Sequence, residues 1–289
     1  MLCSNHKTQK HEENKSKRMS DSRPIGIFDS GLGGLSVLKE IRRQLPAEST
    51  LYFADQGRLP YGPRPLAQVR RFSEQVTRFL LAHSAKVIVV ACNTASAAAL
   101  AHLRQTFPGV PFVGMEPAVK PAAEQTKNRV VGVIATQATA QSALFAGVVD
   151  RFAKGVTVLT RACPGLGTQV EAGELDSPRT YALLHQYLDP LVAGGIDSLV
   201  LACTHFSFLT PAIADVLGPQ VTIIDPAPAV ARQVGRLTAG AHGQPGGDAP
   251  TAIAAYTTAT PPGDSALASR LMGEPITFQS VPLVKLEKF

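Results

Sequence analysis

Residues 86–96 read KVIVVACNTAS, and residues 197–207 repeat the pattern as DSLVLACTHFS. Each stretch is a short apolar run that ends in Ala-Cys and continues into polar residues able to begin a helix. Continuous apolar runs of this length are typical of strands buried in a parallel sheet. The repeat therefore predicts two similar halves, each with a cysteine at the end of a central strand.

The flanking segments repeat as well. Residues 24–46, PIGIFDSGLGGLSVLKEIRRQLP, predict a strand, a glycine-rich loop and a helix that ends before Pro46. Residues 129–136, RVVGVIAT, predict the equivalent strand of the second half, and strands alternate with amphipathic helices after both. We therefore expect an α/β fold with two similar doubly wound domains, whose parallel sheets are related by a pseudo-twofold axis with the active site between them.

The chain is expected to cross between these domains twice. Residues 112–128 form the first crossing, and residues 222–238 read as a strand and helix that return to the first domain. Residues 239–250, AGAHGQPGGDAP, predict a mobile loop. The expected division is a disordered extension over 1–23, a discontinuous first domain over 24–117 and 226–289, and a second domain over 118–225.

Composition excludes several classes of protein. Of 289 residues, 45% are hydrophobic and 17% are charged, which argues against a coiled coil or bulk disorder. The polar N-terminus lacks the apolar run of a secretory signal, and the apolar segments are strand-sized, so we expect a cytoplasmic protein that does not contact a membrane. The net charge is +6, half of it in the first 23 residues, and no basic stripe interleaved with aromatics predicts nucleic-acid binding.

Cys92 and Cys203 are the strongest candidates for chemistry. Each follows an apolar strand and precedes a helix, so the helix N-terminus would lower the pKa of the thiol. A single such cysteine is more often a small buried hydrophobe. Two equivalent cysteines in a duplicated chain favour a functional pair.

Polar residues accompany both cysteines. Asn93, Thr94 and Thr204 could donate hydrogen bonds to a carboxylate, or could cap helices. Asp29 and His205 could relay protons or bind an ammonium group; otherwise Asp29 is a helix cap and His205 a satisfied, partly buried histidine.

Other interpretations find weaker support. The loop GLGGLS (31–36), with Asp55, resembles a dinucleotide-binding motif, but Ser36 stands where Gly or Ala is expected and Asp29 would repel a pyrophosphate. A zinc site lacks the usual ligand spacing. Cys163 has no partner in the first half and is interpreted as structural, and Cys3 lies in the N-terminal extension.

In combination these motifs resemble the glutamate racemase family of cofactor-independent amino-acid racemases, from residue 24 to the C-terminus. The matching stretches, in family order, are IGIFDSGLGGLSV, YFAD, PYG, ACNTAS, GMEPA, GVIAT, ACP, VEAG, ACTHF and IDPAPAVA. The resemblance implies interconversion of L- and D-glutamate with no cofactor and no metal, supply of D-glutamate for peptidoglycan, and a homodimer.

The resemblance also implies a site. Its catalytic cysteines fall on Cys92, the base for D-glutamate, and Cys203, the base for L-glutamate, with Asp29 and His205 assisting them. Its substrate-binding positions fall on Asp29, Ser30, Tyr61, Gly62, Asn93, Thr94, Thr204 and His205.

Two features qualify this assignment. The chain departs from the family pattern at Ser207 and Phe208, which affects the wall of the site more than the reaction. An aspartate racemase of the same superfamily would share both cysteines. The chemistry nevertheless agrees with the residues, because racemisation needs one acid/base group on each face of Cα.

Overall fold

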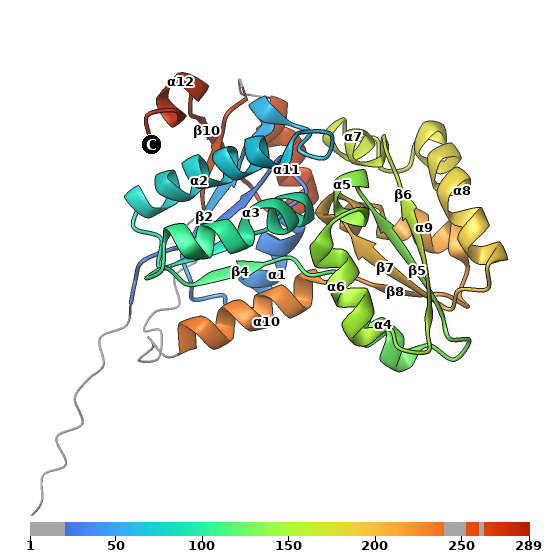
Figure 1. The fold of residues 1–289 in the computed structure, drawn as a ribbon. Coiled ribbons are helices and arrows are strands. Elements are labelled where there is room, and N and C mark those ends of the chain that lie inside the picture. Colours follow the sequence, from blue (N-terminus) through green and yellow to red (C-terminus); the bar gives the residue numbers. More distant parts are fainter. Residues whose placement is uncertain (1–20, 240–252, 260–262) are drawn as a thin grey trace, which may run out of the picture.

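The computed structural model describes residues 21–239, 253–259 and 263–289, whose ten strands form two parallel sheets. The first sheet has the order β10-β9-β2-β1-β3-β4 and the second has the order β6-β5-β7-β8 (Figure 1). The first contains β1 (Ile25–Asp29), β2 (Thr50–Ala54), β3 (Val87–Val90), β4 (Phe112–Gly114), β9 (Ile253–Thr257) and β10 (Phe278–Ser280). The second contains β5 (Val130–Ala135), β6 (Thr157–Ala162), β7 (Ser198–Ala202) and β8 (Thr222–Ile224).

Helices cover both faces of the first sheet because its central strands are apolar on both sides. Ile25 and Ile27 pack among the helices of one face, while Phe28 points into the core of the other. One face carries α1 (Leu35–Gln44), α10 (Ala227–Thr238) and α11 (Gly263–Met272); the other carries α2 (Leu66–Ala82), α3 (Asn93–Thr106) and the short α12 (Leu283–Leu286).

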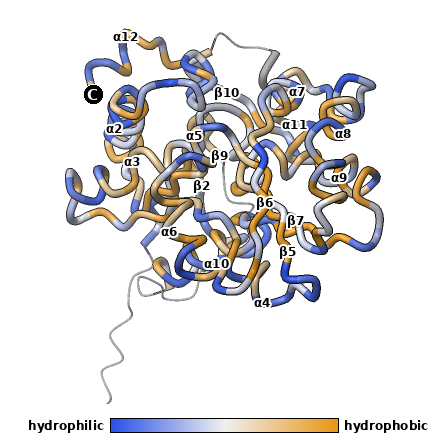
Figure 2. The backbone as a smooth tube through the Cα atoms, turned by 45° about the vertical axis from the view of Figure 1, so that its right-hand side comes forward, coloured by the Kyte–Doolittle hydropathy of each residue, from blue (hydrophilic) through white to orange (hydrophobic). Residues whose placement is uncertain are grey.

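The second sheet is built in the same way. Val131 and Val133 of β5 pack against α4 (Val119–Gln125) and α6 (Ala143–Phe152), whereas Ile134 faces the opposite helices. That opposite face carries α7 (Leu166–Glu171), α8 (Pro178–Ala193) and α9 (Thr210–Leu217). The strands run as hydrophobic segments through the interior of both halves (Figure 2).

The strand orders confirm the predicted fold class. The order β2-β1-β3-β4 recurs as β6-β5-β7-β8, so β3 and β7 occupy equivalent places in their sheets. Cys92 follows β3 and Cys203 follows β7, as the repeat predicts. The two halves differ after the cysteines, because α3 begins at Asn93 whereas Cys203 is followed by a 3₁₀ helix, η2 (Thr204–Leu209).

Helix α1 illustrates how the sequence sets an element and its position. Leu35, Leu38 and Ile41 recur on one face and are buried against the sheet. Arg42 and Arg43 lie in the last turn, where positive charge favours the helix dipole. The helix ends at Gln44, before Pro46. At its other end it begins directly after the glycine loop, which follows the end of β1.

Some expectations fall on residues outside the described part of the chain. These are the first twenty residues of the predicted extension and positions 240–250 of the predicted mobile loop. Among the helices that are described, none is long and apolar enough to cross a membrane.

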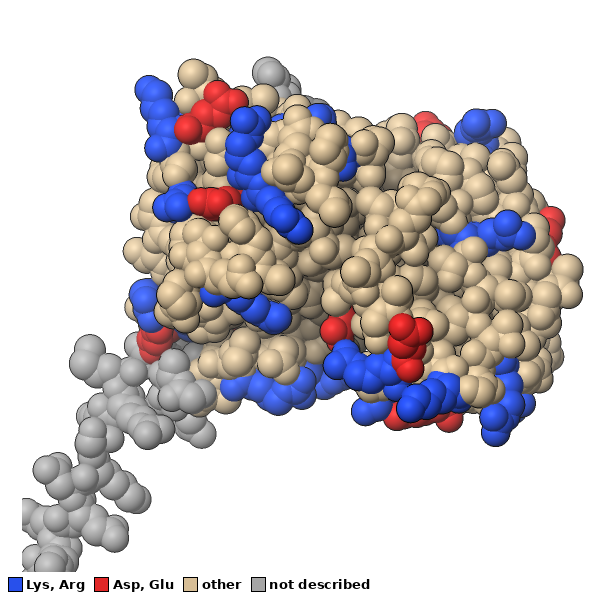
Figure 3. Space-filling model, viewed as in Figure 1, with Lys and Arg blue, Asp and Glu red and all other residues tan. Residues whose placement is uncertain are grey.

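On the face seen in Figure 3, basic side chains lie next to acidic ones along much of the molecular edge.

Candidate active site

A cavity of about 380 Å³ opens at the carboxyl ends of the strands, between the two sheets. Parallel α/β sheets place ligands at these ends because the loops there converge. The lining includes every site residue predicted from the sequence: Asp29, Ser30, Tyr61, Gly62, Cys92, Asn93, Thr94, Cys203, Thr204 and His205. Residues separated by more than 170 positions thus meet in one space.

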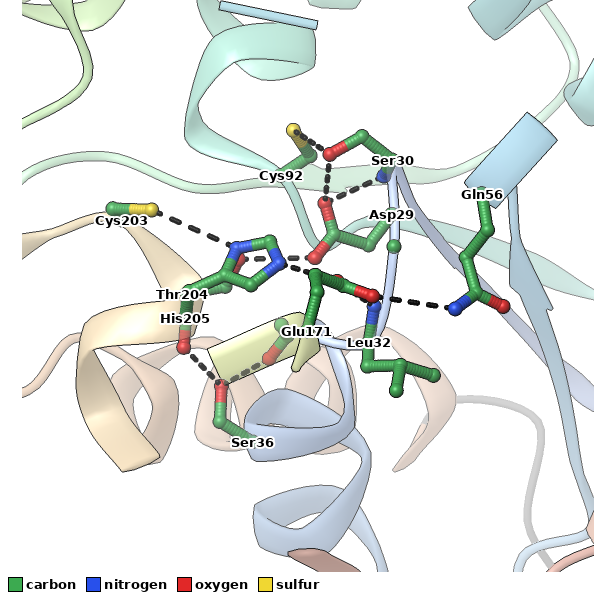
Figure 4. Close-up of polar contacts among 12 residues, drawn as sticks. Asp29, Ser30, Leu32, Ser36, Gln56, Cys92, Glu171, Cys203, Thr204 and His205 are labelled. Atoms are coloured by element: carbon green, nitrogen blue, oxygen red, sulfur yellow. Dashed lines mark hydrogen bonds and ion pairs between the residues drawn. The ribbon is translucent and has the colours of Figure 1, made fainter. Parts of the chain in front are cut away.

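Cys92 is the N-cap of α3, and the backbone N–H of Ala95 donates to its Sγ at 3.4 Å. The thiol donates to Oγ of Ser30 at 3.8 Å (Figure 4). Burial, and next the neighbouring Asp29 carboxylate, raise the pKa of Cys92 well above its ordinary value. The prediction of a lowered pKa is therefore wrong for Cys92 in this pocket, because these two effects outweigh the helix N-terminus.

Asp29 connects the two halves of the site. Its Oδ1 accepts hydrogen bonds from the N–H of Ser30 at 2.6 Å and from Oγ of Ser30 at 3.3 Å. Its Oδ2 accepts a hydrogen bond from Oγ1 of Thr204 at 3.0 Å, across the boundary between the sheets. The side chain is fully buried, and burial raises the pKa of Asp29 despite these donors.

Cys203 lies beside a histidine that is paired in turn with a carboxylate. Its Sγ is 3.8 Å from Nδ1 of His205, and Nε2 of His205 is 2.6 Å from Oε1 of Glu171. We assign the proton of a neutral imidazole to Nε2, because Glu171 can only accept there while ionised, which leaves Nδ1 facing the thiol.

The charges of this pair reinforce each other. Burial lowers the pKa of His205, but hydrogen bonds to Cys203 and Glu171 outweigh it and raise that pKa well above its ordinary value. Burial alone would raise the pKa of Glu171, but the hydrogen bond from His205 and the other donors outweigh burial and lower this pKa overall. The arrangement favours an imidazolium next to Cys203, and an imidazolium stabilises a thiolate.

Glu171 is a functional candidate that the sequence analysis did not assign. It lies in the VEAG stretch that the family resemblance cites, but nothing in its spacing points to His205. Its carboxylate also accepts from the N–H of Leu32 at 2.6 Å and from Nε2 of Gln56 at 3.2 Å, both in the first half of the chain (Figure 4). Only the packing of the halves brings these groups together.

Polar groups on the cavity wall are partly free to bind a ligand. The amide of Asn93 is buried, and neither its oxygen nor its nitrogen has a hydrogen-bond partner among the described residues. Because buried polar groups are normally paired, this amide is suited to a polar ligand. Oγ1 of Thr94 pairs with Oγ1 of Thr136 at 3.0 Å, which adds Thr136 to the wall.

Tyr61 lines the cavity, but its hydroxyl group is not free to bind a ligand. Its hydroxyl donates to Oδ2 of the buried Asp55 at 2.5 Å, so the polar end of the side chain is already engaged. Burial and Asp55 raise the pKa of Tyr61 well above its ordinary value. The ring and the loop backbone that carries Gly62 form the cavity wall instead.

Cys163, interpreted from the sequence as structural, also lines the cavity. Burial raises the pKa of its thiol to about 12, and the thiol donates to the carbonyl oxygen of Arg161 at 3.5 Å. Its hydrogen bond goes to a backbone carbonyl, whereas Cys203 lies beside His205 and Cys92 beside Ser30, and this difference distinguishes Cys163 from the two candidate bases.

The glycine loop packs against the second half of the chain, which disfavours the dinucleotide interpretation. A Cβ atom on Gly31 would stand 2.1 Å from Oε1 of Glu171. The space that a pyrophosphate would need is thus occupied by protein. No group of three or more His, Cys, Asp or Glu side chains within the described ranges is arranged to hold a metal ion.

Fold and cavity together define an α/β enzyme whose site lies between two similar parallel-sheet units. The sequence profile of the Asp/Glu/hydantoin racemase family matches residues 25–234. The chain belongs to this family.

Individual relatives agree with the family assignment. The chain is 53% identical over 221 residues to a glutamate racemase of Roseiflexus sp. (strain RS-1), which covers 76% of this chain and 81% of the relative. A crystal structure of a glutamate racemase isoform from Bacillus anthracis gives a TM-score of 0.81 at 36% identity, covering 90% and 98% of the two chains. Escherichia coli glutamate racemase, solved with L-glutamate and the activator UDP-MurNAc-Ala, gives 0.79 at 30% identity with the same coverages.

Proposed function

We propose that this protein is a glutamate racemase that interconverts L- and D-glutamate with Cys92 and Cys203 as its two acid/base groups. The observation that carries the proposal is the pair of thiols at equivalent strand ends, both lining one cavity in opposite electrostatic surroundings. Racemisation removes the Cα proton from one face and delivers a proton to the other, so it requires such a pair.

The surroundings of the two thiols support different roles for them in the proposed reaction. The raised pKa of Cys92, caused by burial and Asp29, favours the thiol as long as no substrate ammonium lies beside Asp29. His205 and Glu171 favour the thiolate at Cys203. In the L-to-D direction, Cys203 takes the Cα proton as an S–H bond forms, and the S–H bond of Cys92 breaks to protonate the opposite face. The reverse direction starts from the state that this step leaves: the Cys92 thiolate takes the Cα proton of D-glutamate, and the S–H bond of Cys203 breaks to protonate the opposite face.

The remaining wall residues hold the amino acid. Asn93 offers its unpaired side-chain amide to the α-carboxylate, where negative charge is delocalised as the carbanion develops. Thr94 and Thr204 add neutral donors through their backbone N–H groups, because their hydroxyl groups already bond Thr136 and Asp29. The substrate ammonium would lie near Asp29, which also relieves the repulsion between Asp29 and a Cys92 thiolate. Ser30, Tyr61 and Gly62 close the pocket around the side chain of the substrate.

The wider biological assignment follows from this activity. We propose that the product D-glutamate is used for peptidoglycan, that the enzyme works in the cytoplasm as a homodimer, and that neither a cofactor nor a metal takes part. We further propose a discontinuous first domain over 24–117 and 226–289 around a second domain over 118–225. The sheet membership of β8 and β9, and the packing of α10 on α1, support this division.

Circular dichroism of purified protein with L-glutamate, D-glutamate or L-aspartate, after dialysis against EDTA and without added cofactor, tests the activity. We expect loss of optical activity with both glutamate enantiomers. Turnover of aspartate alone would make the protein an aspartate racemase, and activity restored only by zinc would refute the metal-free mechanism.

A deuterium experiment tests the two-base mechanism. In D₂O, early turnover of L-glutamate should place deuterium at Cα of the D-glutamate product, while recovered L-glutamate stays protiated. Substantial early label in the recovered substrate would indicate a single base that serves both faces.

A further inference from the structure

Gln56 contacts the acid/base pair of the second half from the first half of the chain. It is the first residue of the 3₁₀ helix η1 (Gln56–Arg58), which is separated from the end of β2 by Asp55 alone. Its Nε2 donates to Oε2 of Glu171 at 3.2 Å (Figure 4). Glu171 in turn accepts from His205, the neighbour of Cys203.

The orientation of the Gln56 amide is set by a buried hydroxyl. Oγ1 of Thr257, at the end of β9, accepts a hydrogen bond from the N–H of Ala259 at 3.1 Å. Its proton is then free to go to Oε1 of Gln56, at 2.8 Å. Because Oε1 is held by Thr257, the donor Nε2 must face Glu171.

The two oxygens of Glu171 are held unequally. Oε1 accepts from both the N–H of Leu32 and Nε2 of His205, each at 2.6 Å. Oε2 accepts from Gln56 alone among the residues that the structure describes. Gln56 therefore fixes the rotation of the carboxylate plane about the Oε1 contacts.

We propose that Gln56 is a positioning residue for the reaction: it orients Glu171 so that His205 presents Nδ1 to Cys203 when the two domains are together. Thr257 supports it by fixing the amide. The inference rests on the proposed racemase function. It assigns to the first domain a part in activating the thiol of the second, which would make Cys203 fully effective only in the assembled site.

The consequence is a directional effect on turnover. Cys203 acts as base from L to D and as acid from D to L, so weaker support of the His205 imidazolium should slow the first direction more. Because the equilibrium constant of racemisation is one, kcat/KM must remain equal in both directions. A larger fall in kcat from L to D must therefore appear together with a larger fall in KM for L-glutamate.

The test compares Gln56→Leu and Gln56→Glu with the wild type, with both directions followed by circular dichroism. Gln56→Leu should lower kcat from L to D about tenfold, the scale of one hydrogen bond to a charged group, and lower kcat from D to L less. Gln56→Glu should lower it further, because it sets a second carboxylate against Glu171. Gln105→Leu is the matched control, since Gln105 is exposed near the end of α3.

Each result bears on the inference. Equal changes of kcat in both directions, or no change in Gln56→Leu, would overturn the positioning role while leaving the racemase function in place. An inactive wild type would refute the proposed function itself. Should Gln56→Leu not fold, Gln56→Asn withdraws the amide by one methylene while keeping it polar, and the same directional split is expected.

Discussion

Gly33 of the glycine loop lies directly against His205, so that a Cβ atom on Gly33 would stand 2.5 Å from Nδ1 of His205. The same atom would stand 2.6 Å from Oγ1 of Thr204. Neither neighbour can move freely, because Glu171 holds His205 and Asp29 holds Thr204. The absence of a side chain at Gly33 is thus what allows the two halves of the site to approach each other.

Gly33→Ala should therefore reduce racemisation by at least about 100-fold, since a displacement of about 1 Å in an active site can have that effect. Turnover by circular dichroism and Tm by thermal unfolding check this. Gly147→Ala is the control: Gly147 is exposed in α6 with no atom within 4 Å of the added Cβ. It should leave turnover unchanged and stabilise the helix by about 0.5–1 kcal/mol.

The three buried cysteines of the cavity should respond differently to substitution. Cys92→Ala and Cys203→Ala should each abolish net racemisation in both directions, because every turnover needs one acid and one base. Cys163→Ala should retain measurable turnover, because the Cys163 thiol donates to a backbone carbonyl and Cys163 has no equivalent in the first half of the chain. Loss of activity in a folded Cys163→Ala variant would show that the third thiol participates.

His205→Asn should lower kcat more from L to D than from D to L. The imidazolium supports the thiolate form of Cys203, which is the base for L-glutamate in the proposed mechanism. Any compensating change must fall on KM, because the equilibrium constant is one. Progress curves from both enantiomers measure the effect, and equal losses of kcat would remove His205 from this role while retaining Cys203 as a base.

The His205 and Glu171 pair should also give a pH-dependent contribution to stability. The raised pKa of His205 means that its contribution is present below its ordinary pKa of 6.5 and is lost as pH rises through the folded value. The lowered pKa of Glu171 means that its contribution is present above its ordinary pKa of 4.5 and is lost as pH falls through the folded value. Together they stabilise the fold most in mildly acidic solution.

Urea unfolding of wild type and His205→Asn at about pH 6 and about pH 9 measures this contribution. The difference in free energy of unfolding should shrink toward the higher pH. His185→Asn, at an exposed histidine on α8, should change stability by less than about 0.5 kcal/mol at both pH values. A His205 difference that grows toward pH 9 would contradict the assigned pairing.

The sequence by itself determined the fold class and the candidate cysteines. Apolar runs such as residues 87–90 and 198–202 have a single stable location, the interior of a parallel sheet, and the carboxyl ends of such strands meet at one edge. Once the duplicated pattern is seen, Cys92 and Cys203 follow as equivalent positions. These inferences rest on local periodicity and on topology, and both can be inferred from the order of residues in the chain.

Only the tertiary structure decided which side chains of the site contact one another and how these contacts shift their pKa values. The contacts of Glu171 with Leu32, Gln56 and His205 join segments with no shared periodicity, so no spacing rule predicts them. The pKa of Cys92 rises although its position at a helix N-terminus predicts a fall. The physical reason is that burial depends on how the two halves pack, and that burial together with the Asp29 carboxylate exceeds the local effect of a helix end.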